Sequence, residues 1–177
     1  DDTQLAKNLV FKGGTCAALM GKLDRFSVDL DFDIKEKTDI EELAHRLEKI
    51  FSSLGLQVKD RSKNVIQYYL KYAAPSGPRS TLKLDAISAT FGADTFEPVF
   101  LADIDRYMVC QTIETMFAHK LVALTDRYDK HHAIAGRDMY DIHFFFLNGY
   151  KYNEQVITQR TGLKVKDYFI RLKDFVE

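Results

Sequence analysis

Residues 28–34 alternate strictly between apolar and acidic side chains, and this pattern constrains the fold more than any other in the chain. Its acidic positions are Asp29, Asp31 and Asp33. A period of two predicts a β-strand with one apolar and one acidic face, and the first two carboxylates would lie about 6.8 Å apart along it. Such a face suits Mg²⁺ or Mn²⁺, which prefer oxygen ligands. The alternative is an exposed acidic strand without a ligand.

Two adjacent glycines, Gly13 and Gly14, follow a short apolar stretch at residues 9–11 and precede a helical stretch from Thr15 to about Leu23. We expect a buried strand, a glycine turn and a helix. Glycine lets the backbone approach an anion, and the N–H groups at a helix N-terminus attract phosphate. Thr15 could cap this helix and bind a phosphate oxygen. A plain tight turn would have the same sequence.

A second alternating segment, residues 81–87, places Lys83 and Asp85 on one face of a predicted strand. Aspartate is unfavourable in strands, so its presence calls for a reason. Chemistry that uses two metal ions on phosphate groups needs a third carboxylate, and Asp85 is the candidate. It would also assist deprotonation of an attacking hydroxyl. The alternative is an exposed edge position.

Residues 111–128 have helical periodicity, with an apolar stripe beside which Lys120 and Arg127 share one side. Lys120 could place its ammonium on a triphosphate or extend along the apolar stripe into solvent. Arg127 could act likewise, or pair with Asp138. In the helix predicted at residues 138–147, Asp138 is equally suited to capping the N-terminus. Asp141, one turn on, would need Lys120 or Arg127 as a partner if buried.

Two blocks of this sequence resemble the AbiEii/AbiGii toxin family of nucleotidyltransferases, within the polymerase-β-like nucleotidyltransferase superfamily. The first, residues 11–32, contains FKGGT and RFSVDLD. The second, residues 114–147, contains KLVAL, Arg127 and RDMYDI. Val28 stands where an acid is common in the family. The spacing from Gly14 to Asp29 suits this family and is longer than in the wider superfamily.

The resemblance implies an α+β fold with a small mixed sheet flanked by helices, followed by C-terminal helices. It also implies Mg²⁺- or Mn²⁺-dependent transfer of a nucleotidyl group from an NTP, with tRNA as a possible acceptor, by the toxin of a bacterial toxin–antitoxin or phage-defence pair. The metal ligands would be Asp29, Asp31 and Asp85, which are also catalytic together with Lys120 and Asp141. The nucleotide-binding residues would be Gly13, Gly14, Thr15, Ser27, Lys120, Arg127 and Asp138.

The 177 residues, 46% of them hydrophobic, suffice for one domain with an appendage. We expect a nucleotidyltransferase core at residues 1–105 and a helical part at residues 106–177, which ends abruptly and suggests a truncated chain. The net charge of −1 argues against a protein whose whole surface is basic and binds nucleic acid. Residues 160–173 are locally basic and would either contact an RNA backbone or form the solvated side of a helix. Without a membrane-length apolar run, a signal peptide or a Cys framework, the sequence predicts a cytoplasmic protein.

Several further elements can be predicted from local patterns. A capping box that starts at Thr38 opens a helix to Leu54. Strands are expected at residues 65–72 and 95–102, a turn at residues 74–78 within a hairpin, and a last helix at residues 164–176. Two other functions remain open: a non-catalytic nucleotide-binding regulatory module, and an enzyme that modifies a small molecule such as an antibiotic.

Overall fold

The computed structural model describes residues 2–73, 80–88, 91–132 and 135–176. Within these ranges the strands are β1 (Leu9–Lys12), β2 (Leu30–Ile34), β3 (Gln57–Arg61), β4 (Ile66–Lys71), β5 (Thr81–Ile87), β6 (Phe96–Leu101) and β7 (Arg106–Gln111). The helices are α1 (Thr3–Asn8), α2 (Gly13–Leu19), α3 (Ile40–Ser53), α4 (Ile113–His131), α5 (Gly136–Leu147), α6 (Glu154–Thr161) and α7 (Val165–Val176), with a 3-10 turn at Ala102–Ile104. The expected α+β fold is confirmed.

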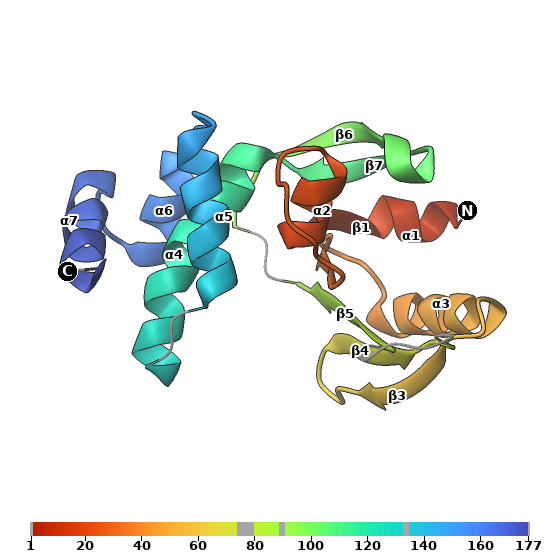
Figure 1. The fold of residues 1–177 in the computed structure, drawn as a ribbon. Coiled ribbons are helices and arrows are strands. Elements are labelled where there is room, and N and C mark those ends of the chain that lie inside the picture. The colour runs from red at the N-terminus through yellow and green to blue at the C-terminus, as the bar shows by residue number, and fades with distance from the viewer. Residues whose placement is uncertain (1, 74–79, 89–90, 133–134, 177) are drawn as a thin grey trace.

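All seven described strands belong to one mixed sheet, in the order β3-β4-β5-β2-β1-β7-β6 (Figure 1). β2 lies at its centre, antiparallel to β1 and parallel to β5. This arrangement sets Asp31 opposite Lys12 on one side and Asp85 on the other. The two alternating segments, far apart in sequence, are therefore neighbours with their acidic positions in register.

Two hydrophobic cores hold the sheet. The smaller one lies against α3, whose Leu43, Leu47 and Phe51 recur every fourth residue and are buried against the sheet. The larger one joins α2 and β7 to the C-terminal helices, which gather at one end of the molecule in Figure 1. Phe117 and Tyr168 are fully buried there. The apolar faces predicted for the helices are thus the faces that pack.

Some predicted boundaries were wrong. The helix after the glycines runs from Gly13 to Leu19, not from Thr15 to Leu23, and β2 begins at Leu30, so Asp29 lies just before the strand. The sequence analysis missed α1, β3, β7 and α6. β3 is exposed at every position, and α6 has only eight residues, so neither carries a strong apolar period. Residues 106–111, grouped with the helices, form a sheet strand, while the turn predicted at 74–78 lies outside the described residues.

The helix α3 is capped by Asp39, one residue later than the capping box predicted. The Asp39 carboxylate accepts hydrogen bonds from the backbone N–H groups of Glu41 (3.0 Å) and Glu42 (3.1 Å). Thr38 instead donates its hydroxyl hydrogen to the carbonyl of Lys35 (2.7 Å). Aspartate and threonine are both good N-cap residues, so local sequence alone does not decide between them.

Among the residues that the structure describes, no helix is long and apolar enough to cross a membrane. Cys16 and Cys110 are both free and buried.

The cap assignment can be tested by stability measurements. We expect Asp39→Ala to lower the free energy of unfolding by about 1 kcal/mol, because two N–H groups at the start of α3 lose their acceptor. Thr38→Ala should cost less than about 0.5 kcal/mol. Urea denaturation of both variants measures the difference. A larger loss for Thr38→Ala would place the cap at residue 38.

Candidate active site

Two aspartates lie side by side on the central parallel strands. Asp31 of β2 is the register partner of Asp85 of β5, and both project to the same face of the sheet. Burial raises the pKa of Asp31, and the nearby charge of Asp85 raises it further, with a smaller contribution from Asp29. The carboxylates of Asp85 and Asp29 are thus close enough to raise the pKa of Asp31. The structure opposes ionisation of Asp31 in the absence of a counter-charge.

The carboxylate of Asp85 forms an ion pair with Lys83, two residues earlier on the same strand face. Its other oxygen, Oδ1, is buried and has no hydrogen-bond partner among the described residues. Leaving a buried carboxylate oxygen unpaired is costly, so this atom needs a donor or a cation. Within the described ranges, no three acidic, His or Cys side chains already converge on a point that could hold a metal. The adjacent carboxylates and the unpaired oxygen nevertheless fit a hard divalent cation.

Asp33, the third residue of the acidic face, has a different role. Its side chain is completely buried, pairs with Lys12 of β1 and accepts a hydrogen bond from Gln111 Nε2 of β7 (2.8 Å). Burial raises the pKa of Asp33 even though Lys12 favours the ionised form. The side chain therefore links three neighbouring strands and is occupied by protein partners.

The two glycines make room for side chains of the site. Gly13 has φ +80°, and a Cβ atom there would lie 2.5 Å from Oδ2 of Asp31. At Gly14, a Cβ would lie 2.8 Å from Nη2 of Arg25 and 3.2 Å from Oγ of Ser27. Any larger residue at position 13 would displace the Asp31 carboxylate, and at position 14 it would displace Arg25.

Thr15 fixes the chain just before β2. Its hydroxyl donates to the carbonyl oxygen of Asp29 (2.6 Å) and lies 2.9 Å from the hydroxyl of Ser27. Thr15 is not the N-cap that the sequence suggested, because α2 begins at Gly13 with Lys12 at the N-cap and no side-chain cap bond. Thr15 and Ser27 thus position the segment that carries Asp29.

A network of ion pairs joins α4 and α5 to the segment before Asp29. Arg25 binds Asp141 through Nε (2.5 Å) and Nη2 (2.7 Å), and the Lys120 ammonium lies 2.8 Å from both Asp141 and Asp138. Arg127 Nε lies 3.3 Å from Asp138. Burial alone would raise the pKa of Asp141, but Arg25 and Lys120 hold it below its ordinary value. With three cations and two carboxylates, the network retains a net positive charge.

These contacts decide between alternatives that the sequence left open. Asp141 is buried and paired with Lys120, as predicted, although its main partner, Arg25, was missed. Arg127 pairs with Asp138, as suggested. Lys120 points to carboxylates and not into solvent, and Asp138 does not cap α5, whose N-cap is Ala135. Arg25 follows no periodic pattern, so only its place beside the acidic motif could have indicated a role.

A cavity of about 480 Å³ opens between the sheet and the helices α4 and α6. Four cationic and two acidic side chains line it, which makes the wall electropositive. Five predicted site residues line it, whereas Asp29, Asp85, Gly14, Thr15, Ser27 and Asp141 do not. The lining residues are Lys12, Gly13, Asp31, Ile87, Phe91, Gln111, Met116, His119, Lys120, Ala123, Arg127, Asp138 and Arg160.

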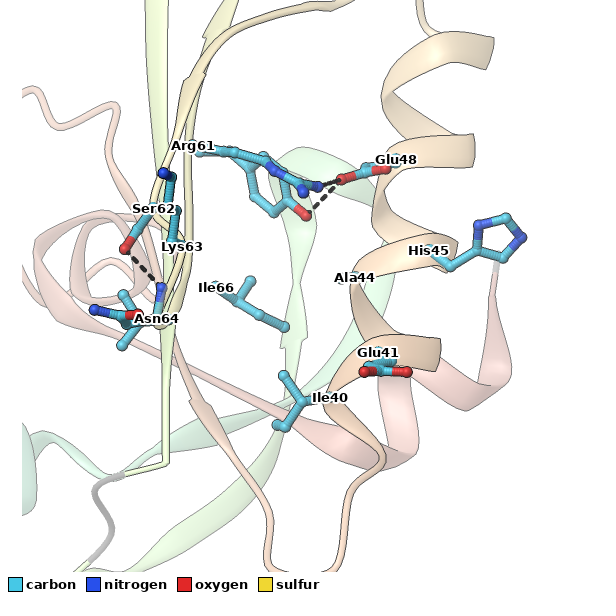
Figure 2. Close-up of a pocket in the computed structure, with 12 residues that line it drawn as sticks. Ile40, Glu41, Ala44, His45, Glu48, Arg61, Ser62, Lys63, Asn64 and Ile66 are labelled. Atoms are coloured by element: carbon cyan, nitrogen blue, oxygen red, sulfur yellow. Dashed lines mark hydrogen bonds and ion pairs between the residues drawn. The ribbon is translucent and has the colours of Figure 1, made fainter.

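Another pocket, of about 470 Å³, lies between α3 and the loop that joins β3 to β4 (Figure 2). Glu48 crosses it to accept hydrogen bonds from Arg61 (2.8 Å) and Tyr68 (3.0 Å). None of the predicted site residues lines this pocket. The cavity beside Asp31 is therefore the candidate active site.

The chain belongs to the family described as nucleotidyl transferase AbiEii toxin of type IV toxin–antitoxin systems, because the family model matches residues 1–166. The structure is similar to that of JHP933 from Helicobacter pylori, with a TM-score of 0.58 and 27% identity over 97% of this chain and 68% of that one. No match was found among curated proteins.

The fold is also similar to that of MenT4, a nucleotidyltransferase toxin from Mycobacterium tuberculosis. The TM-score is 0.56 and the identity 20%, over 85% of this chain and 53% of MenT4. The resemblance seen in the sequence is confirmed, and the protein is a nucleotidyltransferase. Its family implies a nucleotide substrate and an antitoxin partner.

The electrostatics of Asp31 give a test that separates stability from activity. We expect Asp31→Asn to raise the free energy of unfolding at pH 7 and to reduce nucleotidyl transfer by about 100-fold or more. The stability gain should vanish on acidification, because folded Asp31 takes up its proton at a higher pH than in the unfolded chain.

Urea denaturation over a pH series measures this effect. Asp60→Asn, at an exposed position of β3, is the matched control and should leave both quantities nearly unchanged. A less stable Asp31→Asn protein at pH 7 would contradict the electrostatic account.

Proposed function

We propose that this protein transfers a nucleoside monophosphate from an NTP to an acceptor hydroxyl, with Mg²⁺ or Mn²⁺ held by Asp29, Asp31 and Asp85. The observation that carries the proposal is that Asp31, the register partner of Asp85, lies beside Gly13 in the wall of an electropositive cavity. Cavities of roughly 300–1,000 Å³ accommodate ligands of nucleotide size. The unpaired Oδ1 of Asp85 adds a free ligand atom.

The reaction requires little covalent chemistry from the protein. The acceptor oxygen forms a bond to the α-phosphorus of the NTP, the bond to the β-phosphate oxygen breaks, and pyrophosphate leaves. Asp85 would accept the proton of the acceptor hydroxyl after its ion pair with Lys83 breaks. A bound divalent cation would lower the pKa of that hydroxyl and neutralise phosphate charge. Positioning and charge stabilisation supply the rate.

Lys120 and Arg127 would stabilise the charge that develops on the leaving pyrophosphate. Both line the cavity, and the network that holds them has one more cation than carboxylates. Asp138 and Asp141 fix the two cations in place, so no reorganisation is needed when charge develops. Gly13, Gly14, Thr15 and Ser27 would shape the turn that receives the phosphates.

For the acceptor we propose RNA, with tRNA ends as the first substrate to test. The protein would act in the cytoplasm as the toxin of a phage-defence pair and be held inactive by its antitoxin. The family description supports the roles of toxin and antitoxin in this proposal. Because the net charge is −1, an RNA acceptor would be bound by local basic side chains and not by a generally basic surface.

Transfer can be measured directly with labelled NTPs, Mg²⁺ and total RNA. We expect labelled RNA with the natural chain and at least about 100-fold less with Asp85→Asn or Asp29→Asn. Asp60→Asn, exposed on β3, is the control and should label normally. NTP binding without transfer to RNA or to a panel of antibiotics would favour a regulatory module, whereas labelled antibiotic would identify a small-molecule enzyme.

The metal site has a separate test that needs no substrate. Because a cation would relieve the repulsion between Asp31 and Asp85, Mg²⁺ or Mn²⁺ should raise the melting temperature. Saturation at about 100 times the dissociation constant contributes about 2.7 kcal/mol. Asp85→Asn should lose most of this shift, and Asp60→Asn should retain it. An equal shift in both variants would place the cation elsewhere.

A further inference from the structure

The cavity has two chemically different walls, because α4 turns successive side chains by about 100°. Lys120 faces α5 and its carboxylates, whereas His119 faces α6. The second wall also contains Phe91, from the loop before β6, and Arg160 of α6. The proposed phosphate contacts use only the first wall. The second wall is therefore available for another part of the substrate.

Arg160 is held rigidly in this second wall. Its Nη1 donates to Nδ1 (3.0 Å) and to the carbonyl (3.2 Å) of His119, and its Nη2 donates to Asp126 (2.5 Å). The side chain is only 17% exposed. The sequence analysis expected the basic residues 160–173 to contact an RNA backbone or to form the solvated side of a helix, but the guanidinium of Arg160 is held by His119 and Asp126. Little rotamer entropy remains to be lost when a ligand binds.

The orientation of His119 is itself fixed by a buried acid. Its Nε2 lies 2.8 Å from Oδ1 of Asp94, whose side chain is completely buried. The carboxylate accepts a hydrogen, so Nε2 carries the proton and Nδ1 is left to accept from Arg160. Burial alone would raise the pKa of Asp94, but the bond from His119 and the Phe91 N–H hold it lower. An ionised acid thus sets the histidine tautomer that anchors Arg160.

A guanidinium carries five N–H donors and no acceptor. Three donors of Arg160 are satisfied, which leaves Nε–H and one hydrogen on Nη2 without an acceptor in the part of the chain described. Its central carbon lies 5.7 Å from the centre of the Phe91 ring. The lining of the cavity therefore includes an aromatic ring, the apolar Ile87 and Met116, and an arginine with two N–H donors that have no acceptor. A planar ring with acceptor atoms along its edge matches these features.

We propose that Arg160 selects the base of the incoming NTP, favouring bases with a carbonyl acceptor (guanine, cytosine and uracil) over adenine. The proposal rests on the nucleotidyl transfer proposed above. Guanine presents O6 beside N7, and the pyrimidines present O2 or O4, whereas adenine places an amino donor at the equivalent edge. The adenine amino group is itself a donor, so it cannot accept a hydrogen bond from the two N–H groups of Arg160 that have no acceptor. Burying these donors unsatisfied would be costly.

The test measures binding of the four α,β-methylene NTP analogues, in Mg²⁺, by calorimetry. We expect the natural chain to bind at least one carbonyl-bearing base about tenfold or more tightly than adenine, as one bidentate contact allows. Arg160→Lys keeps the charge but loses the planar fork, and should reduce this ratio to about threefold or less. Arg171→Lys, on the exposed pair with Asp129, is the matched control and should keep the full ratio.

Binding of inorganic tripolyphosphate distinguishes a base contact from a phosphate contact. If Arg160 contacts the base, Arg160→Lys leaves tripolyphosphate affinity unchanged. An equal loss for tripolyphosphate and all four analogues would assign Arg160 to the phosphates and overturn the proposal. Asp126→Asn is a second, milder variant, because Asp126 is half exposed and anchors Arg160 from outside the cavity. It should lower the ratio partially.

The outcomes also separate this proposal from the proposed function. Equal affinity of the natural chain for all four analogues, or tightest binding of adenine, overturns the role of Arg160 while RNA labelling still stands. If none of the analogues binds the folded protein, both proposals fall. A ratio that persists in Arg160→Lys and in Asp126→Asn assigns base selection to other residues.

Discussion

The register of β2 between β1 and β5 is the constraint on which the site depends. Packing of the partly buried Leu30 and Phe32 on one face of β2 forces Asp31 onto the other, where Asp85 is its direct neighbour. If the register of β2 shifted by one residue, Asp31 would face the core and the apolar side chains would face away from it. The hydrophobic effect therefore excludes this shifted register. Apolar packing thus brings two like charges together, and the raised pKa of Asp31 is the electrostatic result.

Helix α5 is tied to the segment before β2 by the buried pair of Arg25 and Asp141. Removing one partner of such a pair leaves a buried charge alone and costs about 3–5 kcal/mol. Gly14 has a direct part in it, because a side chain there would meet the Arg25 guanidinium. The glycine pair is therefore explained by two protein contacts, Asp31 at Gly13 and Arg25 at Gly14. Phosphate binding at this turn stays a prediction.

The sequence was most informative where periodicity and chemistry coincided. The alternation around Asp31 and around Asp85 predicted two strands, and their shared chemistry predicted that they would meet, which the register confirms. Whether these carboxylates bind metal and nucleotide stays a prediction after the structure is known. Mg²⁺ binding follows from the acidic strand face and from the resemblance, whereas an RNA acceptor follows from the resemblance alone.

Residues without a periodic signal escaped the sequence analysis. Asp33 lay on the predicted acidic face, but its hydrogen bond from Gln111 depends on β7, a strand that was not predicted. Arg25 and Asp94 lie outside regular elements, and their partners are more than 20 residues away in the chain. Long-range polar pairs of this kind leave no local pattern, so only the assembled fold reveals them.

The buried acids of this protein divide into two groups with opposite dependence on pH. Ionised Asp31 and Asp33 oppose folding at neutral pH, because burial raises their pKa, and the penalty disappears as pH falls through the raised values. Asp141 and Asp94 have a lowered pKa because their donors outweigh burial, so they stabilise the fold at neutral pH and lose that contribution on acidification. The second group fixes Lys120 and Arg160, whereas the first includes the carboxylate at the cavity wall. Protein partners thus satisfy the acids that orient the walls, while Asp31 keeps an unfavourable charge that a cation would neutralise.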